Sequence, residues 1–155
     1  MNEGTPTFGH LNAANFKFAI VCARFNGSIT ERLLAGAMDG LKGSGASDIE
    51  VVHVPGAWEL PMAAKAIAEH KPDAIIALGA VIRGDTPHFD YVAGQAASGL
   101  AAVQLQTNIP VVFGLLTTNT VEQAAARAGG DSGNKGYDAA IAAIQMAELM
   151  RRLRK

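Results

Sequence analysis

The chain has 155 residues, of which 49% are apolar and only 17% charged, and its formal net charge is −1. This length allows a single domain, residues 1–155, with a substantial core. The near-neutral charge gives no reason to expect nucleic acid binding, and no apolar run is long enough to span a membrane. The single cysteine, Cys22, excludes an internal disulfide and is typical of a protein in a reducing cytoplasm. The low charged fraction indicates further burial between subunits.

The N-terminal part of the chain predicts an arm followed by a first strand and helix. Residues 1–15 are polar and contain no apolar core like that of a signal peptide, so we expect a flexible N-terminal arm. The apolar run at 16–23 predicts the first strand. Ser28, with Glu31 three positions later, resembles a capping box and predicts a helix that ends in the glycine-rich turn at 43–45.

The next part of the chain repeats this order. A second strand is predicted at 49–54, and a helix from about residue 58 to 69 follows it. Pro61 is tolerated there because it falls in the first helical turn. The run at 73–82 is almost uninterrupted in its apolar character, which is typical of a strand that is covered on both faces.

A long helix is predicted after this third strand, ending at about residue 106. Thr86 can cap it, and Pro87 suits its first position, where a missing N–H costs nothing. The apolar run at 109–116 predicts the fourth strand.

The C-terminal part predicts two further helices. Thr120 and Gln123 form a second capping-box pattern, which starts a short helix that ends near residue 128. The glycine-rich segment 129–133 predicts a flexible break. The last helix is predicted at 134–153.

Strands that alternate with helices in this way run parallel, with right-handed crossovers. We therefore expect an α/β fold, a three-layer structure in which a four-stranded parallel sheet has helices on both faces, as in flavodoxin-like proteins. Ligands of such sheets bind outside the carboxyl ends of the strands. The segments 24–26, 55–59, 82–88 and 115–119 should therefore share one rim.

The most distinctive part of this rim is the turn Gly84-Asp85-Thr86, which precedes a helix. A helix N-terminus presents unpaired N–H groups and a partial positive charge, which suit a phosphate. His88 follows in the first helical turn, where it either takes part in chemistry on a phosphorylated molecule or has a structural role. No two histidines have metal-ligand spacing, so we expect no metal.

Other rim residues allow two interpretations each. Phe25 either offers a flat face for a ring to stack on or belongs to the core at a strand end. Glu59 either accepts hydrogen bonds from a polyol or complements the helix dipole. Arg127 and Lys135, which flank the glycine-rich break, either hold phosphate or are solvated surface charges. Asp138, one turn after Lys135, either orients one of these cations or forms an exposed pair.

Taken together, these segments resemble the lumazine synthase family. The segments that carry the resemblance occur in the family's order and span residues 24 to 136: Arg24-Phe-Asn26, Val54-Pro-Gly-Ala-Trp-Glu-Leu-Pro61, Gly79-Ala-Val-Ile-Arg-Gly-Asp-Thr-Pro-His-Phe-Asp-Tyr-Val92, Phe113-Gly-Leu-Leu-Thr-Thr-Asn119, Arg127-Ala-Gly129 and Asn134-Lys-Gly136. The third segment is long and highly specific.

The resemblance implies a reaction without a cofactor. Members of the family condense 5-amino-6-(D-ribitylamino)uracil with 3,4-dihydroxy-2-butanone 4-phosphate to 6,7-dimethyl-8-ribityllumazine, phosphate and water, the penultimate step of riboflavin biosynthesis. By resemblance, His88 would move protons; the pyrimidine and ribityl chain would be bound by Phe25, Ala57, Trp58, Glu59, Val81, Ile82, Phe113 and Lys135; and phosphate would be bound by Gly84, Asp85, Thr86 and Arg127. Phe113, Arg127 and Lys135 would come from the neighbouring subunit, and a role for Asp138 stays open.

The resemblance also implies a homopentamer built around the helix that follows His88. The short turn at 129–136 is similar to that of shell-forming members, which favours a 60-subunit shell over a free pentamer or decamer. Two other hypotheses use the same scaffold. One is a non-catalytic flavin or lumazine carrier, and the other is a structural compartment that encloses a partner enzyme such as riboflavin synthase.

Overall fold

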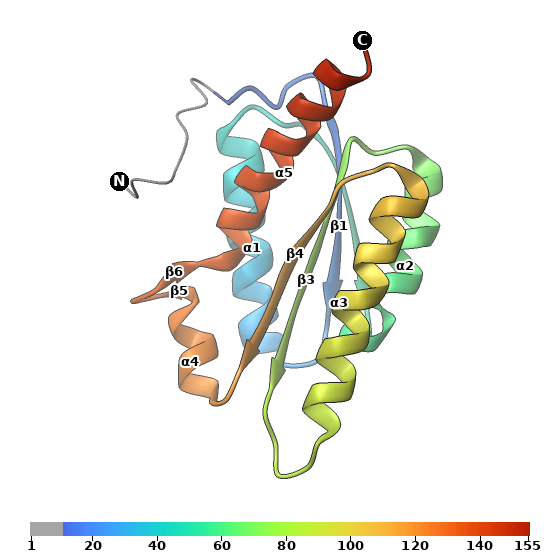
Figure 1. Ribbon diagram of the computed structural model, residues 1–155. Coiled ribbons are helices and arrows are strands. Elements are labelled where there is room, and N and C mark those ends of the chain that lie inside the picture. Colours follow the sequence, from blue (N-terminus) through green and yellow to red (C-terminus); the bar gives the residue numbers. More distant parts are fainter. Residues whose placement is uncertain (1–10) are drawn as a thin grey trace.

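The computed structural model of the protein describes residues 11–155 (Figure 1). Residues 1–10 of the predicted arm lie outside the described residues. Within the last five residues of that arm, Ala13 is fully buried, and its backbone N–H donates to the Ser44 carbonyl at 2.8 Å.

A four-stranded parallel sheet forms the centre of the protein, in the order β2-β1-β3-β4. The strands are β1 (Lys17–Ala23), β2 (Asp48–Val54), β3 (Ala74–Ile82) and β4 (Val111–Thr118). Helices α1 (Gly27–Gly43) and α5 (Lys135–Leu153) cover one face, and α2 (Leu60–Ile67) and α3 (His88–Thr107) cover the other (Figure 1). The predicted three-layer α/β fold with a parallel sheet is confirmed.

The strand β3 lies at the centre of this arrangement. Its side chains point alternately to the two helical layers, so Ile76 and Leu78 pack with α1 and α5, while Ile75 and Ala77 pack with α2 and α3. All four are fully buried. Burial on both faces explains why the strand is apolar at nearly every position and not only at every second one.

Helix starts differ from the predictions in two of three cases. The capping box of Thr120 and Gln123 is confirmed at the start of α4 (Val121–Ala126), where the Gln123 N–H donates to Thr120 Oγ1 at 3.1 Å. The predicted box of Ser28 is wrong, because α1 already begins at Gly27, after Asn26. The predicted Thr86 cap is also wrong: α3 begins at His88, and no side chain caps it.

The predicted flexible break after α4 is wrong too. It forms an antiparallel hairpin of two short strands, β5 (Ala128–Gly130) and β6 (Gly133–Asn134). The Asn134 side chain caps α5 by accepting from the N–H groups of Gly136 and Tyr137 at 2.8 and 3.1 Å. Its amide also donates to the Arg32 carbonyl on α1 at 3.0 Å. The hairpin is therefore attached to both helices of this layer.

The described residues contain neither a helix that could span a membrane nor a cluster of potential metal ligands. None of the helices within 11–155 has both the length and the apolar character needed to cross a bilayer. In the same part of the chain, no three histidine, cysteine, aspartate or glutamate side chains gather where they could hold a metal ion.

The close contact between α1 and α5 depends on Gly136, because a Cβ atom there would lie 1.9 Å from the Leu33 carbonyl oxygen. We predict that Gly136→Ala lowers the free energy of unfolding by about 1–3 kcal/mol or more, as overpacking does. Urea unfolding at one fixed protein concentration measures this. Gly43→Ala is the matched control, since nothing lies within 4 Å of its Cβ position. Equal stabilities of the two variants would contradict the prediction.

Cys22 on β1 gives the stability a dependence on pH. Burial raises the pKa of its thiol from 9.0 to about 11. Since the unfolded thiol ionises first, the free energy of unfolding should fall as pH rises from 9 towards 11. Urea unfolding of the wild type and of Cys22→Ala across this range measures the effect. The wild type should lose more stability than the variant, and an equal loss in both would show that the native thiol ionises normally.

Candidate functional site

A cavity of about 180 Å³ lies at the carboxyl ends of β1 and β3. We call it the Phe25 cavity. It is lined by Phe25, Asn26, Ala57, Ala80, Val81, Ile82, Gly84, Thr86, His88, Phe89 and Val92. Seven of the predicted site residues meet here: Phe25, Ala57, Val81, Ile82, Gly84, Thr86 and His88.

Phe25 is placed by the turn between β1 and α1. Its backbone N–H donates to the Pro55 carbonyl at 3.0 Å, and the next residue, Asn26, has a positive φ of 62°. The Asn26 side-chain amide donates to the Ala80 carbonyl on β3 at 2.9 Å, which holds the turn against the neighbouring strand. The Phe25 side chain remains 71% exposed, so it does not belong to the core. It offers a ring face beside the cavity.

Another part of the cavity wall comes from the end of β3 and the segment between β3 and α3. Val81 and Ile82 are half-buried at the end of β3, and Gly84 and Thr86 follow in an irregular turn. His88 is the first residue of α3, so its imidazole lies beside the turn at a helix N-terminus. Asp85 is exposed and does not line the cavity. The wall therefore combines an apolar strand end with a helix start that suits an anion.

Trp58 and Glu59 lie in the short 3-10 turn Ala57–Glu59 that precedes α2. Ala57 lines the Phe25 cavity, whereas Trp58 and Glu59 line a separate groove of about 550 Å³ between α2 and α3. Glu59 Oε1 accepts from the Gly56 N–H at 2.8 Å, so this carboxylate completes the start of the turn. Its second oxygen stays available for another donor.

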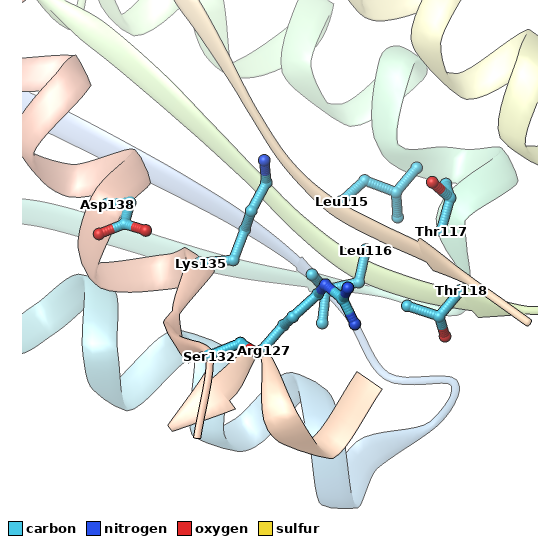
Figure 2. Close-up of a pocket in the computed structure, with 8 residues that line it drawn as sticks. All are labelled: Leu115, Leu116, Thr117, Thr118, Arg127, Ser132, Lys135 and Asp138. Atoms are coloured by element: carbon cyan, nitrogen blue, oxygen red, sulfur yellow. The ribbon is translucent and has the colours of Figure 1, made fainter. Parts of the chain in front are cut away.

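Arg127, Lys135 and Asp138 line a second cavity, of about 320 Å³, which we call the Arg127 cavity (Figure 2). Arg127 directly follows α4 and Lys135 is the first residue of α5, and Figure 2 shows both side chains beside the end of β4. Arg127 Nη1 donates to the Gln123 carbonyl at 3.0 Å. No ion pair joins Asp138 to either cation in the described part of the chain. Both cations therefore keep donors for an anion.

The two cavities have no lining residue in common. Between them runs β4, an edge strand that pairs only with β3 in the described residues. Phe113 on this strand is 38% exposed and lines neither cavity. One protomer therefore divides the predicted site residues between two separate places, and it leaves the strand between them open along one edge.

Several lining residues were not predicted. Asn26 is the clearest, and its signal was an Asn-Gly pair in the loop after the first strand, which favours a left-handed turn. Phe89 and Val92 lie one and four positions after His88, which puts them on adjoining parts of the helix surface. Thr118 lines the Arg127 cavity and lies in the predicted rim segment 115–119, whereas Ser132 lines the same cavity and carried no sequence signal.

A third cavity, of about 330 Å³, includes Cys22, Arg24 and His53 in its lining. A thiol beside cations can act as a nucleophile, but burial raises the pKa of Cys22 to about 11, so the thiol stays protonated. None of the predicted site residues lies here. The carboxyl-end rim near Phe25 and His88 remains the better candidate.

Comparison with known proteins identifies relatives over almost the whole chain. The family model described as 6,7-dimethyl-8-ribityllumazine synthase matches residues 15–151. A protein of that name from Clostridium kluyveri is 55% identical over 148 residues, which cover 94% of this chain and 96% of the relative. Another, from Desulfotalea psychrophila, is 57% identical over 150 residues, covering 94% and 97%.

The matched region contains all residues that line the Phe25 and Arg127 cavities. The relatives also match this chain over nearly their own full length. The chain therefore belongs to the 6,7-dimethyl-8-ribityllumazine synthase family, transferases of riboflavin biosynthesis.

Proposed function

We propose that the protein condenses 5-amino-6-(D-ribitylamino)uracil with 3,4-dihydroxy-2-butanone 4-phosphate, releasing 6,7-dimethyl-8-ribityllumazine, phosphate and water. The observation that carries this proposal is that Phe25, His88 and two residues of the turn at 84–86, Gly84 and Thr86, lie around one cavity. The family membership supports the same reaction. Mixing both substrates and following phosphate release together with lumazine absorbance tests it. A non-catalytic lumazine carrier would bind the product and release no phosphate.

The ring of the uracil substrate stacks on Phe25 in this proposal. The exposed ring of Phe25 is available for an offset stack, and Val81 and Ile82 supply an apolar wall. The ribityl chain extends towards the turn at 57–59, where the free oxygen of Glu59 and the backbone of Ala57 and Trp58 offer hydrogen bonds. The substrate is then fixed by one aromatic face and several directional polar contacts.

The phosphate of the second substrate binds at Gly84, Asp85 and Thr86. The start of α3 provides N–H groups without helical partners, and its N-cap residue, Pro87, makes no side-chain cap. Arg127 adds a guanidinium, which suits the geometry of phosphate oxygens. Because Asp85 is exposed and outside the cavity lining, its carboxylate has room to stay away from the phosphate.

We further propose that the site is completed by a neighbouring subunit, which brings its Phe113, Arg127 and Lys135 to the Phe25 cavity. The Phe25 cavity alone, at about 180 Å³, is smaller than the roughly 300–1,000 Å³ of most ligand pockets. The open edge of β4 and the exposed ring of Phe113 suit a contact between protomers. Asp138 in the Arg127 cavity has the position to orient Lys135.

The reaction needs several proton transfers. The amine of the uracil forms an imine with the ketone and releases one water, phosphate is then eliminated, the resulting intermediate tautomerises, and ring closure with loss of a second water completes the lumazine. An imidazole both donates and accepts protons near neutral pH, which gives His88 its role. The turn at 84–86 and Arg127 stabilise the charge that grows on the departing phosphate. Holding the two substrates together supplies much of the remaining rate.

The protein assembles as a homopentamer around α3 and then as a 60-subunit shell in this proposal, in the cytoplasm. The support is a set of large apolar side chains that α2, α3 and the preceding turn leave exposed: Trp58 is 59% exposed, Met62 77% and Leu105 78%. Exposed apolar patches of this kind mark interaction surfaces. Riboflavin synthase would be a partner that such a shell encloses.

We predict that His88→Ala lowers kcat by roughly 100-fold, which lies within the usual range for a general acid or base. Steady-state kinetics with both substrates measures this. His70→Ala is the matched control, because His70 pairs with Glu50 at 2.8 Å, on the exposed surface and outside the cavities. Activity of His88→Ala within a few-fold of the control would remove His88 from the mechanism.

Replacing Arg127 should act on the phosphate substrate. We predict that Arg127→Ala weakens its binding by about 1.5–3 kcal/mol, the value of a hydrogen bond to a charged group. The measurement is the KM of the phosphate substrate at a saturating level of the uracil. Arg152→Ala near the end of α5 is the matched control. An unchanged KM in Arg127→Ala would place the anion site elsewhere.

The assembly is tested by sedimentation. At physiological pH the protein should sediment as a species of about sixty protomers, since large exposed apolar surfaces favour further association. Leu105→Glu introduces a charge on the exposed apolar face of α3 and should shift the population to smaller species. A wild-type protein that sediments only as a pentamer would contradict the shell.

A further inference from the structure

Arg83 is the first residue after β3 and does not line the Phe25 cavity. We infer that Arg83 is a positioning residue, whose side chain holds the turn at 84–86 and the start of α3 against the end of β4. This inference rests on the proposed function of that turn and deepens it. The argument depends on what the Arg83 side chain contacts on each side of the turn.

On one side, Arg83 is joined to the end of β4. Its backbone N–H donates to the Thr118 carbonyl at 2.8 Å, and its Nε donates to Asn119 Oδ1 at 2.9 Å. Asn119 is itself held, because its backbone N–H donates to Gln123 Oε1 at 2.8 Å. Gln123 belongs to the cap of α4. The acceptor that Arg83 uses is therefore anchored to a helix start and is not a free surface amide.

On the other side, Arg83 contacts the first turn of α3. Its guanidinium carbon lies 4.6 Å from the centroid of the Phe89 ring, and its Nη2 lies 3.6 Å from Asp90 Oδ1. Phe89 lines the Phe25 cavity and directly follows His88. One side chain thus spans the turn, from the strand end before it to the helix residues after it.

The turn has little else to fix it. Segment 83–87 contains no helix or strand, and α3 starts after Pro87 without a side-chain cap. A Cβ atom at Gly84 would meet nothing within 4 Å, so packing does not confine that residue. Each Arg83 contact is weak alone, because the side chain is half-exposed. Together they select one geometry for the turn and for His88.

A direct role of Arg83 as a phosphate ligand fits the contacts less well. Its Nε is used by Asn119, its Nη2 faces the Asp90 carboxylate, and the Phe89 ring covers one face of the guanidinium. The carboxylate also offsets the positive charge that an anion would seek. The remaining donors on Nη1 do not provide the two parallel hydrogen bonds with which Arg usually binds phosphate.

The experiment compares Arg83→Ala, Asn119→Leu and the double variant by kcat, by the KM of each substrate and by thermal unfolding. Misplacing reacting groups by about 1 Å costs up to 100-fold in rate, so we expect each single variant to lose roughly tenfold in kcat. The kcat of the double variant should be no lower than that of Arg83→Ala, because the contact that Asn119→Leu removes is already lost in Arg83→Ala. Asn119→Asp, which keeps the acceptor, should recover most of the kcat that Asn119→Leu loses. Arg152→Ala serves as the matched arginine control.

Two results would overturn the inference. One is a wild-type kcat in Asn119→Leu while Arg83→Ala loses activity, since the arginine would then act without its anchor. The other is full activity in Arg83→Lys, because an ammonium group keeps the charge but cannot make the three contacts together. Failure of the proposed function is separate and shows as no phosphate release and no lumazine absorbance when the wild type is mixed with both substrates. The coupling between Arg83 and Asn119 is measured in kcat whichever residue moves the protons.

Discussion

The strand β3 is paired along both edges, with β1 and β4, and is covered on both faces by helices. Parallel pairing brings the carboxyl ends of these strands to one side of the protein, and the chain leaves every strand there through a loop. Phe25 comes from the loop after β1, and His88 from the helix that follows β3. Both residues line one cavity because their strands are hydrogen-bonded neighbours.

The second constraint is the exposed edge of β4. A sheet edge presents unpaired backbone N–H and C=O groups, and Phe113 adds an exposed aromatic ring, so this edge is suited to pairing or packing with another chain. The Arg127 cavity lies along the same strand, next to the hairpin. In the proposed shared site, the Phe25 cavity of one protomer would meet the Arg127 cavity of its neighbour. Catalysis would then depend on assembly, because one protomer alone keeps the two cavities apart.

Rigid attachments hold the functional loops at this rim. Asn134 ties the hairpin to α1 and caps α5, Asn26 ties the Phe25 turn to β3, and Arg83 spans the turn beside His88. Each of these side chains satisfies a backbone group or an amide of another element. Such hydrogen bonds add modest stability but determine where the loops lie.

The alternation of apolar runs and amphipathic segments determined the fold, because a parallel strand that is buried on both faces and a helix that is buried on one face have different apolar periods. The motif residues likewise indicated the rim and most of the Phe25 cavity. Only the tertiary structure decided what depends on contacts between distant segments. Asn26 adopts a left-handed backbone conformation, donates its side-chain amide to the Ala80 carbonyl and makes no side-chain cap for α1. The glycine-rich break becomes a hairpin because Asn134 and Arg32 hold it to α1. The division of the site into two cavities also follows from the strand order, which places β4 at an edge of the sheet. That order depends on which strands pair, and the local sequence of a strand does not determine its partners.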